Sequence, residues 1–139
     1  MVARFFVDEN DLALGRRLAE ERDDVVYPGH EALPEVPRGE SDDVWLPVIG
    51  SRRLAVITRD KRIRCRPLER RAWTDHRVRG FVLTGRTSQS TDASLAILES
   101  HWVRIEELVT ERADGPWYGV TTAGLAEIDL GPVPDDKAG

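Results

Sequence analysis

Compact runs of apolar residues alternate along the chain with stretches in which apolar residues recur at helical spacing. Each compact run is short enough for one buried strand and ends at charged or turn-forming residues. We therefore predict four strands, at residues 3–7, 24–27, 54–58 and 78–84. A terminal hairpin is predicted from 117–120 and 125–130, around the turn Thr122-Ala123-Gly124.

The intervening amphipathic stretches predict helices. One is expected over residues 11–22, and Ser41 is a suitable N-cap for another that runs from 42 to about 50. Pro47 falls within that second helix, where it is expected to fit without distortion only in or near the first turn. The clearest helix covers residues 91 to about 110. Its apolar face consists of Leu95, Leu98, Trp102, Ile105 and Leu108.

Strands that alternate with helices predict an α/β fold with right-handed crossovers and a mostly parallel sheet. The expected strand order is 2-1-3-4, with the terminal hairpin in addition. A length of 139 residues suits one domain. We assign residues 1–130 to that domain, and we expect the polar segment 131–139 to be a disordered tail.

The composition of the chain indicates its cellular location more clearly than its function. Cys65 is the only cysteine, which excludes an intramolecular disulfide and favours a reducing compartment. No apolar run approaches the roughly 18 residues that span a bilayer, and the N-terminal sequence does not resemble a signal peptide. The sequence therefore predicts a cytoplasmic protein that does not enter membranes.

Charge is distributed unevenly along the chain. Residues 52–79 contain 11 Arg or Lys and three acids, a net charge of +8, whereas the whole chain carries −5. A basic segment within an acidic protein is a candidate contact surface for a polyanion. The alternative is a solvated helix face with no ligand.

Acidic residues follow two of the predicted strands. Asp8 ends the first strand and Asp60 follows the third. With the order 2-1-3-4 these strands are neighbours, and ligands of such sheets bind beyond the carboxyl ends of the strands. Carboxylates held close together repel one another unless a cation lies between them, and carboxylate oxygens favour Mg²⁺ or Mn²⁺. Taken singly, each acid could instead end a strand or begin a helix.

A zinc site is not predicted, because the potential nitrogen and sulfur ligands are scattered without metal-binding spacing. They are His30, His76, His101 and Cys65.

Three blocks of sequence resemble the short PIN-like domain family. Phe5-Phe6-Val7-Asp8-Glu9-Asn10 is similar to its opening motif, in which an apolar strand runs into Asp-Glu-Asn. Ser41-Asp42-Asp43-Val44-Trp45-Leu46 resembles its Ser-Asp-acid helix start. Ala55-Val56-Ile57-Thr58-Arg59-Asp60 resembles its apolar strand ending in Thr-Arg-Asp. The order and spacing of the blocks also fit, and the likeness covers roughly residues 3–85.

This resemblance implies a three-layer fold and a metal-dependent ribonuclease, in some members the toxin of a bacterial toxin–antitoxin pair. It implies that Asp8, Asp42 and Asp60 are the catalytic carboxylates that bind Mg²⁺ or Mn²⁺. Asp43 is the alternative to Asp42. Glu9 and Asn10 are implied as further ligands or as residues that support the ligands, and Thr58 could hydrogen-bond a ligand carboxylate or a bound water. The implied partners are RNA, an antitoxin protein and a second copy of the chain.

Basic residues directly after the third strand are expected to contact the RNA backbone, in a salt-dependent and sequence-independent manner. They are Arg59, Lys61, Arg62, Arg64 and Arg66. Four tryptophans could stack on RNA bases, but core packing is the better interpretation. They are Trp45, Trp73, Trp102 and Trp117.

Two other functions fit parts of the pattern. Arg62 stands where the family often has another acid, so a PIN-like module that binds RNA or protein without cutting is one alternative. The other alternative is a phospho-acceptor receiver domain. Such a domain has a threonine after its fourth strand, and Thr84 fits this position. The receiver's lysine after the fifth strand is absent from residues 117–130.

Overall fold

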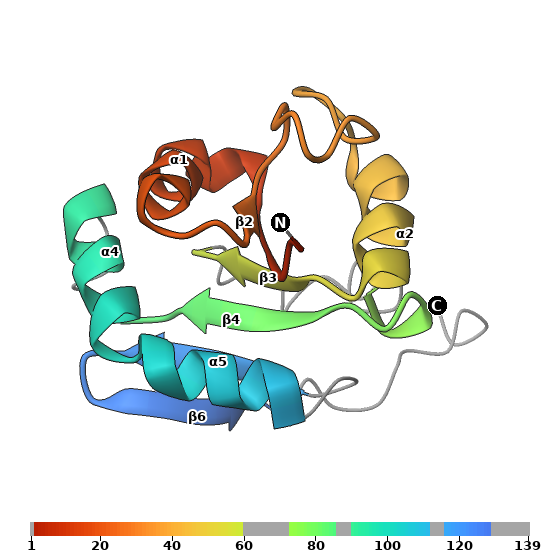
Figure 1. Cartoon of the computed structure of the whole chain (residues 1–139). Helices are drawn as coiled ribbons and strands as arrows, with labels where there is room; N and C mark the ends of the chain where they lie inside the picture. Colours follow the sequence, from red (N-terminus) through yellow and green to blue (C-terminus); the bar gives the residue numbers. More distant parts are fainter. Residues whose placement is uncertain (1, 60–72, 86–89, 112–115, 129–139) are drawn as a thin grey trace.

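The computed structural model describes residues 2–59, 73–85, 90–111 and 116–128, apart from the side chains of Asn10, Asp42 and Asp43. The predicted tail at 131–139 and the basic residues between 61 and 66 lie outside these ranges. A sheet of six strands in the order β2-β1-β3-β4-β5-β6 runs through the molecule (Figure 1). Its strands are β1 (Phe5–Val7), β2 (Val25–Val26), β3 (Ala55–Thr58), β4 (Arg79–Leu83), β5 (Trp117–Thr121) and β6 (Gly124–Ile128).

The predicted order 2-1-3-4 is present, and the hairpin extends the sheet beyond β4. β5 pairs in parallel with β4, and only β6 runs antiparallel, against β5. The helices are η1 (Glu9–Asp11, a 3-10 turn), α1 (Leu12–Glu21), α2 (Asp42–Arg52), α4 (Thr91–Ser100) and α5 (Trp102–Glu111). α2 continues through the exposed Pro47, which lies beyond its first turn.

Residues along the parallel strands alternate between two cores, which is why the fold has three layers. Phe5 and Val7 pack with α1, α4 and α5, whereas Phe6 between them packs with α2. In β3, Ile57 belongs to the first core and Val56 to the second. A strand covered on both faces is apolar on both, as β1 is at all three of its buried positions. Figure 1 shows α1 and α4 side by side, with α2 apart from them.

The predicted helix over 91–110 is two helices, α4 and α5, separated at His101. Its apolar positions were correctly predicted, because all five are buried in the core that α1 shares. The bend lets α4 pack against α1 while Trp102 at the start of α5 lies over Phe5, with ring centroids 4.7 Å apart.

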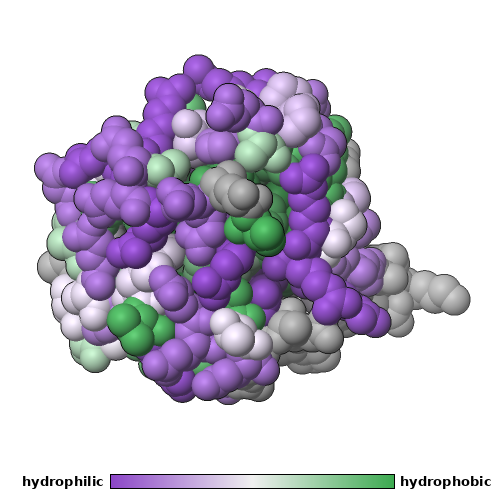
Figure 2. All heavy atoms as spheres, in the orientation of Figure 1, coloured by the Kyte–Doolittle hydropathy of each residue, from purple (hydrophilic) through white to green (hydrophobic). Residues whose placement is uncertain are grey.

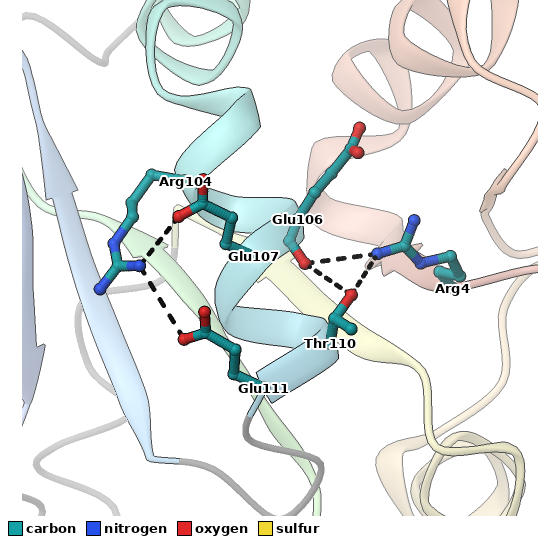
Figure 3. A network of polar contacts seen from close by, with 6 residues as sticks. All are labelled: Arg4, Arg104, Glu106, Glu107, Thr110 and Glu111. Carbon is teal, nitrogen blue, oxygen red and sulfur yellow. Dashed lines mark hydrogen bonds and ion pairs between the residues drawn. The ribbon is translucent and has the colours of Figure 1, made fainter.

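The carboxyl-terminal end of α5 is held to the sheet by arginines. Arg79 in β4 is buried, and its Nη1 donates to the carbonyl of Val109 at 2.9 Å. Arg4, directly before β1, donates to the Glu106 carbonyl at 3.4 Å and to Thr110 Oγ1 at 3.3 Å (Figure 3). Cations at a helix carboxyl terminus satisfy its unpaired carbonyls and oppose its negative dipole end. Both arginines therefore stabilise the position of α5 on the sheet.

Two tryptophans cover the sheet next to α2. Trp117 Nε1 donates to the Val78 carbonyl at 3.2 Å, and Trp73 stacks on Trp117 with centroids 4.3 Å apart. The indole of Trp117 occupies the space above Gly80, where a Cβ would lie 2.7 Å from Trp117 Cζ3 and 2.2 Å from the Val56 carbonyl oxygen. All four tryptophans of the chain are buried, which confirms core packing for each.

The surface in the orientation of Figure 2 is mainly hydrophilic, with apolar residues in small separate patches. Among the described residues, the large apolar side chains that are exposed are Val2, Val44 and Val103. In the described part of the chain, no helix has both the length and the apolar character to cross a bilayer.

Replacing Gly80 with alanine is predicted to destabilise the fold by about 2 kcal/mol, because the added Cβ overlaps backbone and a packed indole. Urea unfolding measures the change. Gly119→Ala, on the neighbouring strand β5, is the control, since its Cβ would be no nearer than 3.4 Å to any neighbouring atom. It should alter stability by less than about 0.5 kcal/mol. Equal effects of the two substitutions would contradict this account of the packing.

Candidate active site at the carboxyl edge of the sheet

Asp8 lies directly after β1, at the carboxyl edge of the sheet. Its backbone is extended, so its side chain continues the strand alternation on the side of Phe6, toward the layer of α2. In the neighbouring strand, Thr58 is buried and its Oγ1 donates to Asp8 Oδ2 at 3.3 Å. The Oδ1 atom of Asp8 is buried as well. The predicted adjacency of the first and third strand ends is confirmed, and Thr58 orients the Asp8 carboxylate.

A second acid, Asp11, joins the same two strand ends and was not singled out by the sequence. Its Oδ2 accepts a hydrogen bond from the Arg59 backbone N–H at 2.9 Å, and its Oδ1 accepts from Arg59 Nε at 2.5 Å. The Asp11 side chain is only 5% exposed and that of Arg59 is 23% exposed. Arg59 therefore fixes the end of β3 to the turn that follows β1, in addition to its predicted contact with RNA.

Glu9 holds the loop that leads into α2. Its Oε1 accepts from the Gly39 backbone N–H at 2.7 Å and lies 3.8 Å from Arg38 Nε. The helix begins three residues later, with residue 42, and Ser41 occupies the N-cap position as predicted. The carboxylate of Glu9 thus positions the segment that carries two of the predicted metal ligands.

These contacts bring Asp8 together with the residues that directly precede the other two predicted catalytic acids. Residues 8–11, 38–41 and 58–59 meet at one edge of the sheet. Asp60 and the side chains of Asp42, Asp43 and Asn10 lie outside the described part of the structure, so their roles as ligands remain predictions. Among the side chains that are described, no three His, Cys, Asp or Glu are close enough to hold a metal ion.

The donor chemistry at this edge fits a hard divalent cation. Asp8 presents carboxylate oxygens in a partly buried position, and a threonine hydroxyl orients one of them. Mg²⁺ and Mn²⁺ prefer such oxygen ligands together with water. Thr84 follows β4 at the same edge, where its backbone N–H donates to the Val120 carbonyl at 3.2 Å. This contact continues the pairing of β4 with β5 by one residue.

A known protein family matches the part of the chain that forms this edge. The sequence model of the PIN-like domain matches residues 3–85, which is 83 of the 139 residues. The chain belongs to the PIN-like domain family. The matched part of this PIN-like chain runs from β1 to β4 and contains Asp8, Thr58 and the loop before α2, whereas α4, α5 and the hairpin lie beyond it. Neither the curated proteins nor the solved structures contain a significant match to the chain.

Arg59→Ala is predicted to lower the free energy of unfolding by about 2–3 kcal/mol. Removing one partner of a fully buried ion pair costs about 3–5 kcal/mol, and this pair is partly exposed. Urea denaturation without added metal measures the effect.

The control for this substitution is Arg104→Ala, which removes an exposed ion pair with Glu107 on α5 (Figure 3). It should change stability by less than about 1 kcal/mol. If Arg59→Ala were as mild as Arg104→Ala, the Asp11–Arg59 pair would not hold the two strand ends together.

Proposed function

We propose that this PIN-like domain is a divalent-metal-dependent ribonuclease that hydrolyses RNA phosphodiester bonds. PIN-like domains are often nucleases, which supports the general class of activity. The observation that carries the proposal is the hydrogen bond from Thr58 Oγ1 to Asp8 Oδ2, at the edge where the loop before α2 also arrives. It orients a carboxylate next to both of the other segments that carry predicted ligands.

The residues that would hold Mg²⁺ or Mn²⁺ are Asp8, Asp60 and either Asp42 or Asp43. A bound divalent ion lowers the pKa of a coordinated water and neutralises charge on the phosphate. The aspartates need not act as bases themselves. Thr58 keeps the Asp8 carboxylate in place, and Glu9 keeps the start of α2 within reach of it. Asn10 is proposed to support these ligands.

RNA is proposed to approach this edge through basic side chains that follow β3. The Arg59 guanidinium lies at this edge, where its Nε donates to Asp11 Oδ1, and guanidinium donors match phosphate oxygens. Lys61, Arg62, Arg64 and Arg66 continue the same run in the sequence. All four tryptophans are buried, so their indole rings are not exposed for stacking on RNA bases.

Asp8→Asn is predicted to reduce metal-dependent cleavage of single-stranded RNA by about 100-fold or more. Residues that only support a metal ligand typically change metal affinity or activity by about 10–100-fold, and Asp8 is proposed as a ligand itself. Cleavage should require Mg²⁺ or Mn²⁺ and stop on addition of EDTA. Circular dichroism checks that the variant stays folded.

Asp92→Asn is the matched control, because it removes the same charge from the exposed start of α4, where Asp92 pairs with Arg17 at 2.9 Å. It should cleave like the wild-type chain. Cleavage by Asp8→Asn at the wild-type rate, or cleavage that persists in EDTA, would refute the assignment. Saturable Mn²⁺ and RNA binding without any cleavage would favour the non-cutting alternative.

Glu9 is predicted to act by positioning the loop before α2. Glu9→Gln retains the Oε1 acceptor for the Gly39 N–H and should keep most of the cleavage activity, whereas Glu9→Ala should lose about 10-fold or more. Metal titration of both variants separates this role from direct ligation. A loss of Mn²⁺ affinity in Glu9→Gln equal to that in Asp8→Asn would make Glu9 a ligand instead.

A further inference from the structure

Two arginines end helical turns in the left-handed backbone conformation. Arg53 ends α2 with φ 58°, and Arg77 ends the turn that begins at Trp73 with φ 57°. Each turn closes with the same pair of backbone hydrogen bonds. Leu54 N donates to Ile49 O and Arg53 N to Gly50 O, and the second turn repeats this with Val78 N to Trp73 O and Arg77 N to Thr74 O. Both are Schellman motifs.

Glycine is the usual residue at this position, because a Cβ is disfavoured in the left-handed conformation. Arg53 and Arg77 are the two non-glycine residues with positive φ in the described part of the chain. The backbone conformation alone would therefore be better served by glycine at both sites. An arginine in this unfavourable backbone conformation suggests that its side chain has a function of its own.

The two arginines are neighbours at the amino edge of the sheet. β3 and β4 pair in parallel with Ala55 opposite Arg79, and each arginine lies two residues before the first paired residue of its strand. The two turns also touch, since a Cβ on Gly50 would lie 2.3 Å from the His76 carbonyl oxygen.

Neither arginine has a carboxylate partner among the described residues, and both side chains are exposed. The adjacent Arg52 is different, because it forms an ion pair with Glu35. Two neighbouring guanidinium groups repel each other, and a bound polyanion would relieve that repulsion.

We infer that Arg53 and Arg77 form a second phosphate-binding surface, which contacts the backbone of the RNA away from the site of cleavage. Guanidinium groups suit this role because their planar donors match phosphate oxygens. Five residue steps of an extended strand separate Arg53 from Thr58, or about 17 Å at roughly 3.3 Å per residue. One RNA strand could therefore contact both edges. This inference rests on the proposed function for the identity of the polyanion.

The test compares salt-dependent RNA binding by the wild-type chain and by the double variant Arg53→Gly/Arg77→Gly. The probe is a fluorescein-labelled oligouridine of about a dozen nucleotides, measured by anisotropy in EDTA between about 50 and 200 mM KCl. Loss of two phosphate contacts should reduce the slope of log affinity against log salt by about 1.4, at about 0.7 per contact for a single strand. Because glycine suits both turns, the Tm should be unchanged or raised.

The charge-matched control is Arg16→Ala/Arg104→Ala, which removes two exposed arginines from α1 and α5 on the other face of the sheet. It should keep the wild-type slope. An unchanged slope in the glycine variant, or an equal loss in the control, would overturn the inference. Binding of polyglutamate by the wild-type chain without binding of RNA would also overturn it and indicate an acidic protein partner.

The inference and the proposed function can fail separately. If RNA binds through Arg53 and Arg77 but is not cleaved in Mg²⁺ or Mn²⁺, the ribonuclease assignment fails and the second surface stands. If RNA is cleaved and the glycine variant retains the wild-type slope, the ribonuclease assignment stands and the second surface fails.

Discussion

The ion pair between Asp11 and Arg59 holds the ends of β1 and β3 together at the candidate active site. Asp11 is almost completely buried, and a carboxylate in that position is costly unless it is paired and hydrogen-bonded. Both of its oxygens bond Arg59, one through the backbone and one through the side chain. The end of β3 is thereby fixed beside the turn after β1, and Thr58 is placed next to Asp8. The ion pair adds to the parallel pairing of Val7 with Ile57, which aligns the same two strand ends.

Much of this arrangement could be predicted from the sequence, because the end of an apolar run marks the end of a strand. The apolar runs before Asp8 and Arg59 identify two strands, and parallel strands place their carboxyl ends at one edge. That reasoning was sufficient to expect the ends of the first and third strands side by side, which the parallel pairing of β1 with β3 confirms. It could not identify Asp11 as the partner of Arg59, because Asp11 reads as an ordinary helix-start acid until the fold supplies a neighbour from 48 positions away. The contact from Glu9 to Gly39 was missed for the same reason, since a backbone N–H in a loop leaves no signal in the sequence.

The break between α4 and α5 shows a different limit of sequence reasoning. The apolar spacing through residues 95–108 is continuous, so periodicity favours one helix. The apolar residues of this stretch are buried as the spacing predicts, but they lie on two helices that meet at His101. Directly after this break, Trp102 packs onto Phe5. The spacing of apolar residues predicts which side chains are buried. It does not predict whether the helix that carries them is continuous or broken.

The separation of charge between the two edges of the sheet follows from the direction of α2. In a crossover between parallel strands, the helix runs back against the strands, so α2 begins at the carboxyl edge and ends at the amino edge. Its first two residues, 42 and 43, are aspartates, and its last turn leads into Arg52 and Arg53. The helix dipole favours acids at the first end and cations at the second. α5 obeys the same rule, since Arg4 and Arg79 bind its carboxyl-terminal turn at the amino edge. One helix direction is therefore compatible with both proposals, a cation bound at the edge where α2 begins and a phosphate bound at the edge where it ends.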